Sequence, residues 1–206
     1  MSATDRLAQL GLTLPPPPKP LGNYVPFRIG GNMLFLSGVG PRRPDGSMIA
    51  GTVGQDVSIE QAYEAARLCG LNLLGNMHAA LGSLDRVDTV LKVLGMVNAA
   101  PGFGDHPKVI DGCTDLFVDV FGDAGRPARS AVGMGSLPRN IAVEIGATGS
   151  GVAAAARACA SGSPLGGRRA GERRPGAAII RPGGRYSSAV SKSAGTTISS
   201  SSTSGE

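Results

Sequence analysis

Arg129 and Glu144 combine charge with a largely apolar setting in the second half of the chain. The guanidinium of an arginine is a planar fork that matches a carboxylate, so Arg129 is a candidate clamp for an acidic ligand. A surface ion pair explains the same residue equally well. Glu144 stands within Ile-Ala-Val-Glu-Ile, where a carboxylate needs a partner or a purpose. It can position or deprotonate an attacking water, or it can simply neutralise an arginine.

The segments around these two residues predict two strands, 129–134 and 140–145, joined by a turn that contains Pro138. The second segment alternates apolar residues with others, as expected of a strand with one buried face. Antiparallel pairing across the turn brings Glu144 within a couple of positions of Arg129. We therefore expect the two side chains to lie close together in one hairpin.

Two helices are predicted to support this hairpin. The first runs from Ser58 to about Leu81 and opens with a capping box, in which the Ser58 hydroxyl and the Gln61 side chain satisfy each other's backbone N–H groups. Its apolar residues recur at three- and four-residue steps and form one stripe. The second helix occupies about 105–121, with Asp105 as its cap and Pro107 in its first turn.

Further strands are predicted at 33–37 and 87–97, so the order is strands, helix, strand, helix, hairpin. This order indicates an α+β protein with two helices on one face of a sheet. In the 87–97 strand we expect Val87, Leu91, Val93 and Val97 on one face, and Val90, Leu94 and Met96 on the other. Two helices cover only one of these apolar faces. We therefore expect an oligomer with a site between subunits.

The composition changes near residue 147. Residues 149–206 contain eight Lys and Arg but only two Glu, whereas the whole chain has a formal net charge of +5. The basic character thus resides in a Gly/Ser/Ala/Arg-rich tail with little apolar surface to bury, which predicts disorder for 147–206. A shifted reading frame or a fused linker accounts for such a tail. The alternative is a basic arm that binds RNA electrostatically.

The N-terminal 19 residues are expected to form an extension, with a short helix from Thr4 to Leu10 and then a Pro-rich spacer at 15–18. The first residues include Asp5 where a signal peptide carries positive charge, and no apolar run has the length of a membrane span. These features favour a cytoplasmic protein.

Cysteine and histidine give no sign of a metal site. Cys69, Cys113 and Cys159 lack metal-ligand spacing, and their odd number argues against a disulfide framework. Cys69 and Cys113 fall on the apolar stripes of the predicted helices, where a buried Cys acts as a small hydrophobic residue. His78 and His106 show no ligand pattern either, so no metal or organic cofactor is expected.

The segment 127–145, with Pro127-Ala-Arg-Ser, then Leu-Pro, then Val-Glu-Ile, resembles the signature of the RidA/YjgF family of reactive-intermediate deaminases. Gly22-Asn-Tyr24 and Leu36-Ser-Gly38 resemble two further elements of that family, in the same order. The resemblance covers about residues 20–146. It implies a chorismate-mutase-like fold, a homotrimer with active sites between neighbours, and hydrolysis of 2-imino or enamine acids to 2-keto acids and ammonia.

The resemblance also implies roles for individual residues. Arg129 clamps the substrate carboxylate, and Glu144 handles the attacking water. Tyr24 supplies an aromatic wall and a hydroxyl, although a packed core tyrosine is nearly as plausible. Ser37 and Gly38 offer backbone groups at a strand end, where Gly allows close approach.

Two positions depart from the family pattern. Ala131 stands where many deaminating members have Cys, and Val39 stands where they often have Gln. The missing thiol favours a second hypothesis, a non-catalytic trimer that binds small carboxylates or another protein. RNA cleavage has been attributed to some relatives. The part of this chain before the tail is nearly neutral and gives that activity no support.

Overall fold

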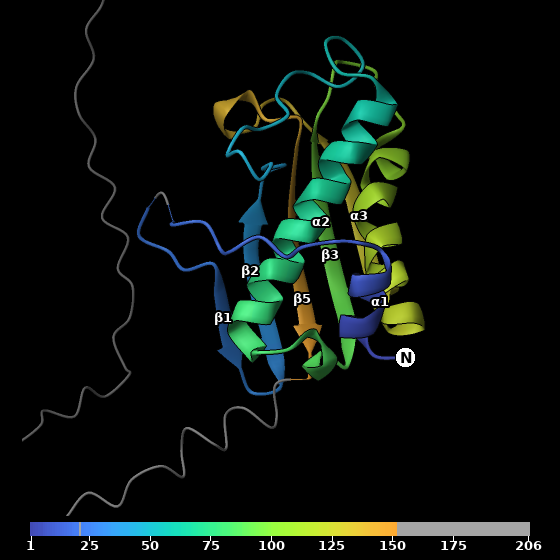
Figure 1. Ribbon diagram of the computed structural model, residues 1–206. Coiled ribbons are helices and arrows are strands. Elements are labelled where there is room, and N and C mark those ends of the chain that lie inside the picture. Colours follow the sequence, from blue (N-terminus) through green and yellow to red (C-terminus); the bar gives the residue numbers. More distant parts are fainter. Residues whose placement is uncertain (21, 152–206) are drawn as a thin grey trace, which may run out of the picture. The chain divides into compact units, whose positions relative to one another are not determined.

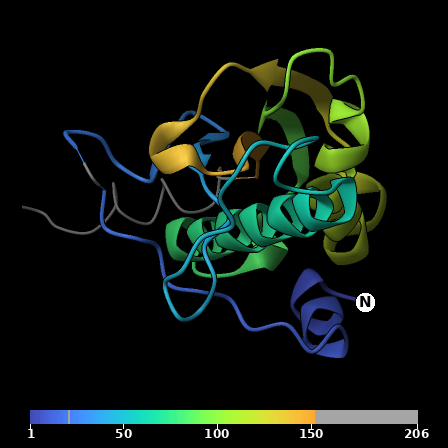
Figure 2. The ribbon, with the colours of Figure 1, turned by 90° about the horizontal axis from the view of Figure 1, so that it is seen from above.

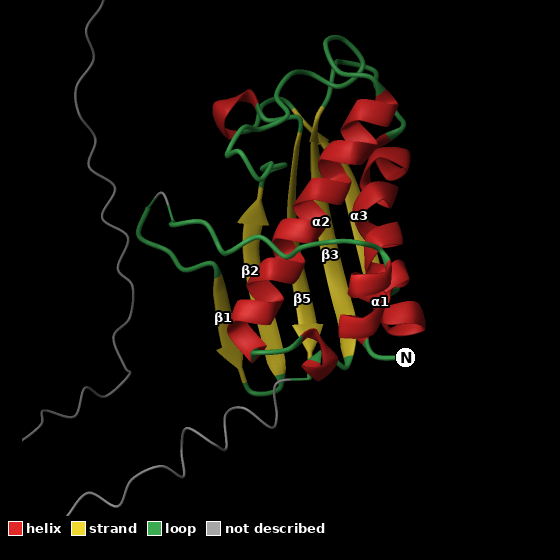
Figure 3. Cartoon of the chain, viewed as in Figure 1, coloured by secondary structure: helices red, strands yellow, loops and turns green. Residues whose placement is uncertain are grey.

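The computed structural model describes residues 1–20 and 22–151, so most of the expected tail, at 152–206, lies outside the described residues. A five-stranded mixed sheet in the order β1-β2-β5-β3-β4 carries helices against one face (Figure 1, Figure 3). Its strands are β1 (Phe27–Gly30), β2 (Met33–Val39), β3 (Thr89–Asn98), β4 (Ala128–Met134) and β5 (Val143–Ser150). The helices are α1 (Ala3–Gln9), α2 (Ile59–Leu81) and α3 (His106–Phe121). The predicted α+β class is confirmed.

The start of α2 follows the sequence prediction. The Gln61 N–H donates to Ser58 Oγ at 3.2 Å, and the Ser58 N–H donates to Gln61 Oε1 at 2.9 Å, which completes the capping box. The helix ends at Gly82, whose φ of 79° lies in the left-handed region that glycine adopts without steric cost. Both predicted boundaries of this helix are therefore confirmed.

The start of α3 is only partly as predicted. Pro107 lies in the first turn, as expected. Asp105 occupies the cap position, but its side chain makes no capping hydrogen bond. Its φ of −88° and ψ of 27° depart from the extended conformation typical of a capping residue, and its carboxylate contacts Lys108 Nζ at 3.0 Å instead. The prediction of a side-chain cap at Asp105 was wrong.

The N-terminal segment packs onto the rest of the fold. The Thr4 N–H and hydroxyl donate to the Asp85 carboxylate at 3.1 and 2.9 Å, which attaches α1. Residues 10–20, which we name the strap, then cross α2 (Figure 1). The Pro15 carbonyl lies so close to Gly75 of α2 that any Cβ there would collide with it. The Pro-rich stretch is therefore a packed part of the fold rather than a free spacer.

The expected hairpin between residues 129 and 145 does not exist, because β3 lies between β4 and β5. β4 runs parallel to β3, and β5 runs antiparallel to it. The chain from β3 to β4 passes through α3, which is the crossover that parallel strands require. After β4, the Ala142 N–H donates to the Ile49 carbonyl at 3.0 Å, so the chain is held by another loop instead of turning back on itself.

The last strand is longer than the composition suggested. β5 continues through Gly146 to Ser150 and pairs with β2 on one side and β3 on the other. Residues 147–150 thus belong to the sheet and not to the tail, which corrects the boundary expected at 146. A central strand is stabilised by hydrogen-bonded neighbours on both edges, so residues of low intrinsic strand propensity still extend there.

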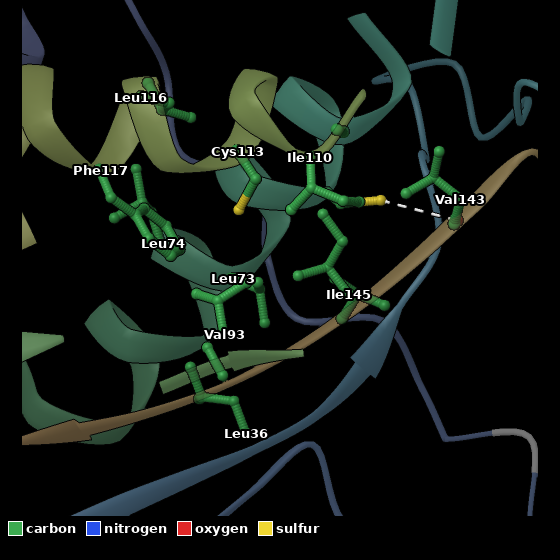
Figure 4. Packing of buried hydrophobic residues seen from close by; sticks show 14 of the residues in the cluster. Leu36, Leu73, Leu74, Val93, Ile110, Cys113, Leu116, Phe117, Val143 and Ile145 are labelled. Atoms are coloured by element: carbon green, nitrogen blue, oxygen red, sulfur yellow. Dashed lines mark hydrogen bonds between the residues drawn. The ribbon is translucent and has the colours of Figure 1, made fainter. Parts of the chain in front are cut away.

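The helices α2 and α3 cover the same face of the sheet (Figure 2). On that face the core contains Leu73, Cys113, Phe117, Val93 and Ile145, all without exposed area (Figure 4). The helices approach each other closely because Gly112 lies directly against the Tyr63 carbonyl, which leaves no space for a Cβ. The buried face of the sheet is therefore complete within one chain.

Within the described residues, the opposite face of the sheet carries no helix. Leu94 lies on this face and is exposed, as predicted, and Met96 is half-buried. Val90 was wrongly assigned to this face, and Leu91 to the buried one. A register shift between Val90 and Lys92 turns Val90 into the core, where it is 1% exposed, and leaves Leu91 exposed. This open face also presents exposed apolar side chains from other strands: Phe35, Val132 and Met134.

Candidate active site

A pocket of about 210 Å³ lies where β2 ends and the chain leaves the sheet. It brings together three of the residues predicted from the sequence, Tyr24, Gly38 and Glu144. Residues of the strap and of the loop before β5 complete its wall. We name it the Glu144 pocket.

Glu144 is half-buried in β5, directly beside an irregularity in the pairing of β2 with β5. Its carboxyl group packs on Gly38, where a Cβ would lie 3.1 Å from Cδ of Glu144 and closer still to Oε1. The expected need for glycine at this strand end thus has a specific cause, the approach of a carboxyl group. Burial raises the pKa of Glu144 above its ordinary value, because the charged form loses solvation.

The Glu144 pocket is rich in positive charge. Lys19, Arg42 and Arg139 line it, and Glu144 is the only acidic residue that residues 1–20 and 22–151 contribute to its wall. An anionic ligand therefore suits the pocket better than a cationic one.

Arg139 was not singled out in the sequence, and its position depends on unusual backbone. Both Arg139 and Asn140 have φ of 55°, a left-handed conformation that costs energy for residues other than glycine. Asn98 stabilises it, since its Nδ2 donates to Asn140 Oδ1 at 2.9 Å and to the Gly51 carbonyl at 3.1 Å. The sequence did contain one sign of this conformation. Asn140 follows Leu-Pro-Arg, and asparagine adopts the left-handed region more readily than most other residues.

Tyr24 and Ser37 have different environments. Tyr24 is 51% exposed and lines the pocket, which excludes the packed core tyrosine considered as an alternative. The Ser37 hydroxyl donates to the Val25 carbonyl at 2.6 Å, and its N–H donates to the Pro26 carbonyl at 3.0 Å. Within this chain Ser37 thus fixes the loop that carries Tyr24, and a direct contact with substrate stays a prediction.

Arg129 lies elsewhere in the fold. Its Nη1 donates to Asp111 Oδ1 at 2.7 Å and to Thr114 Oγ1 at 3.0 Å, both on α3, and its side chain is 25% exposed. It is in register with Val93 of β3, whereas Glu144 is in register with Met96.

Within one chain, Arg129 and Glu144 are far apart. With strands about 4.8 Å apart and residues about 3.3 Å apart along a strand, their Cα atoms are separated by about 14 Å. Arg129 points toward α3, and it does not line the Glu144 pocket. The expected proximity of the two residues within a hairpin was wrong, because it assumed direct pairing of β4 with β5.

The two residues that depart from the family pattern, Val39 and Ala131, lie in different parts of the fold. Val39 lines the Glu144 pocket, whereas Ala131 packs against the core beside α3. Cys69 and Cys113 are fully buried, and burial raises the pKa of both thiols, so neither is a reactive thiolate.

No group of three or more His, Cys, Asp or Glu residues within 1–20 and 22–151 has an arrangement that could hold a metal ion. None of the helices in these ranges has the length and hydropathy of a membrane-spanning segment.

Comparison with known proteins relates this geometry to a family. Residues 4–145 match the model of the family described as "YjgF/chorismate_mutase-like, putative endoribonuclease". Protein TCP17 of Trypanosoma cruzi is 40% identical over 142 residues, which are 68% of this chain and 89% of that protein. A 2-iminobutanoate/2-iminopropanoate deaminase of Dermatophagoides farinae is 29% identical over 136 residues, 65% of this chain and 90% of the relative.

Among solved structures, a protein of unknown function from Agrobacterium tumefaciens is similar at 43% identity with a TM-score of 0.66, over 72% of this chain and 90% of that one. The family match begins inside α1 and ends in β5, so it spans both helices that cover the sheet and the whole Glu144 pocket. The chain belongs to the YjgF/RidA family.

Proposed function

We propose that the protein hydrolyses small 2-imino or enamine acids to 2-keto acids and ammonia. The observation that carries this proposal is the half-buried carboxyl of Glu144 in a pocket whose other charged walls are cationic. A raised pKa brings a carboxylate closer to the range in which it exchanges protons with water efficiently. The deaminase relative from Dermatophagoides farinae supports the same reaction class.

In the proposed reaction, Glu144 takes a proton from water while the water oxygen bonds to the carbon of the C=N group. The π electrons of that bond move to nitrogen, which takes up a proton from solvent. Glu144 then returns its proton to the nitrogen, the C–N bond breaks and ammonia leaves, and the hydroxyl group releases its proton to solvent as the carbonyl forms. The reaction consumes one water and needs no redox partner, so the residues of the chain suffice for it.

The substrate carboxylate needs a cation, and we propose that Arg129 of a second copy supplies it. The guanidinium is held by Asp111 and Thr114 at the edge strand β4, too far from its own Glu144 pocket. The open face of the sheet presents Phe35, Leu94, Val132 and Met134, all exposed and apolar, which suits burial against other copies. A homotrimer with sites between neighbours is the assembly we propose.

A second candidate function is a non-catalytic trimer that binds small carboxylates or another protein through the same pocket. One observation favours it: residue 131 is Ala and packs against the core, so no thiol is present there. The cationic wall of the Glu144 pocket serves binding as well as catalysis.

Release of ammonia or keto acid from a freshly generated imino acid distinguishes the two functions. The wild type should exceed the uncatalysed rate, and Arg129→Ala should lose most of that excess. Arg126→Ala is the matched control, because Arg126 is exposed and its ion pair in the described part of the chain is with the exposed Asp123. If the wild type and Arg129→Ala both release product at the uncatalysed rate, the enzymatic function is wrong and binding remains.

A further inference from the structure

Asn76 of α2 is buried without a partner. It has no exposed area, and neither its Oδ1 nor its Nδ2 has a hydrogen-bond partner within residues 1–20 and 22–151. Asn72, one turn earlier, is also buried, but its Nδ2 donates to the carbonyls of Arg42 at 3.0 Å and Leu68 at 2.8 Å. Buried amides are nearly always satisfied, so the contrast between these two asparagines needs a physical cause.

A small pocket lies against the Asn76 side chain. Its volume is about 30 Å³, enough for one water-sized group. The strap closes it on one side and β2 on the other. The Ser37 hydroxyl in its wall already donates to the Val25 carbonyl at 2.6 Å. The amide of Asn76 is therefore a buried and uncommitted polar group in the wall of this small pocket.

The small pocket adjoins the Glu144 pocket. The two share five lining residues: Pro18, Lys19, Tyr24, Gly38 and Val39. A ligand whose reacting carbon lies beside Glu144 can therefore extend its side chain past Tyr24 and Gly38 toward Asn76. The volume restricts the end of that side chain to a group the size of a methyl or hydroxyl.

We propose that Asn76 determines substrate specificity by binding a terminal hydroxyl group on the side chain of a small 2-imino or 2-keto acid. A hydroxyl both donates and accepts, so it matches Oδ1 and Nδ2 of the amide together. A methyl group of similar size leaves both amide atoms unpaired, and sites built to bind a hydroxyl discriminate strongly against such analogues. The nature of the acid rests on the proposed function, whereas the role of the amide does not.

Binding of two keto acids tests this assignment directly. The 2-keto acids that correspond to homoserine and norvaline differ only in a terminal hydroxyl or methyl group, and calorimetric titration of the full-length protein measures both. The wild type should bind the hydroxyl acid at least about tenfold more tightly, and Asn76→Leu, of similar volume, should lose that preference. Absence of a preference in the wild type, including failure to bind either acid, overturns the proposal. A preference that persists in Asn76→Leu also overturns it.

Thermal unfolding separates a ligand role from a structural one. Asn76→Leu should keep or raise Tm, because the amide it removes has no partner in the described part of the chain. Asn72→Leu is the matched control and should lower Tm, because it removes two hydrogen bonds. An equal loss in both variants means that Asn76 is paired in the fold, which overturns the proposal.

Turnover of the corresponding imino acids distinguishes this proposal from the proposed function. If the keto acids are discriminated but neither imine is hydrolysed, the role of Asn76 stands and the deaminase function fails. If both imines are hydrolysed at equal rates and the keto acids bind equally, the deaminase function stands and the role of Asn76 fails.

Discussion

At β4, the guanidinium of Arg129 is held by Asp111 and Thr114, whereas at β5 the carboxyl of Glu144 has neither an ion pair nor a hydrogen bond within residues 1–20 and 22–151. The same sequence signature contributes both residues, yet the fold satisfies one and leaves the other unpaired in a pocket. A guanidinium fixed by its own chain is oriented in advance, and a carboxyl without a partner is available for chemistry. Each chain thus carries two half-sites, one at Arg129 and one at Glu144. In our proposal, each half-site is completed by the other half-site of a second copy.

Removal of the unpaired carboxyl tests the Glu144 half-site and should have the largest effect. Glu144→Gln keeps the shape but cannot take a proton from water, so kcat should fall about 10²- to 10⁴-fold. Tm should not fall, because no partner is lost. Steady-state ammonia release and thermal unfolding measure the two effects, with the exposed Glu64→Gln as control. An unchanged kcat would show that Glu144 is not the base.

Removal of the paired guanidinium tests the other half-site and should have a smaller effect. Arg129→Ala should lower kcat/KM about 10- to 100-fold, mainly through KM, because the clamp for the carboxylate is lost. Asp111→Asn retains the guanidinium and weakens only its ion pair, so it should reduce activity less. Initial rates over a range of substrate concentrations separate KM from kcat. A larger loss for Asp111→Asn than for Arg129→Ala contradicts the clamp.

The close contact between Gly38 and Glu144 provides a third test. Gly38→Ala places a Cβ against the carboxyl group, so the carboxyl must shift, and kcat should fall about tenfold. Gly104→Ala is the matched control, because a Cβ there has open space around it. Equal activity in both variants means that the carboxyl position does not matter for turnover.

The pH dependence of stability should show the smallest effect. Burial raises the pKa of Glu144 above its ordinary value of 4.5, so the folded protein binds this proton more tightly than the unfolded chain. The stabilisation from this proton is complete below pH 4.5 and is lost as pH rises through the raised pKa. The free energy of unfolding of the wild type should therefore decline relative to Glu144→Gln across that range, and the decline should be small because Glu144 is only half-buried. Denaturant titrations between pH 4 and 8 measure this difference in the free energy of unfolding. If the wild type instead becomes more stable relative to Glu144→Gln as pH rises, the pKa of Glu144 is not raised.

Local patterns predicted local structure well. The capping box at Ser58 and the left-handed Gly82 located both ends of α2, because each depends on residues a few positions apart. The pairing of β4 was not predicted, since proximity in sequence suggested a hairpin. The helix between β3 and β4 was the stronger signal, because parallel strands need such a crossover.

Features that depend on distant contacts were missed. Gly146 to Ser150 lack the residues typical of strands, and only their two neighbouring strands explain their extended conformation. The position of Arg139 depends on Asn98 and Gly51, which are remote in sequence. Asn76 also lay unnoticed within a regular helical stripe, and only the path of the strap over α2 makes it a candidate ligand-binding residue.

Subunit mixing tests the two half-sites most directly. At substrate concentrations well below the wild-type KM, Arg129→Ala and Glu144→Gln should each retain no more than about a tenth of wild-type activity alone. Oligomers that contain both should regain activity, because some sites join an intact Glu144 to an intact Arg129 of a neighbour. Random assembly of equal amounts in a closed ring leaves about a quarter of the sites intact, so about a quarter of wild-type activity should return. If mixed oligomers demonstrably form and activity does not rise above that of the two variants measured separately, the two residues do not meet across an interface and the account is wrong.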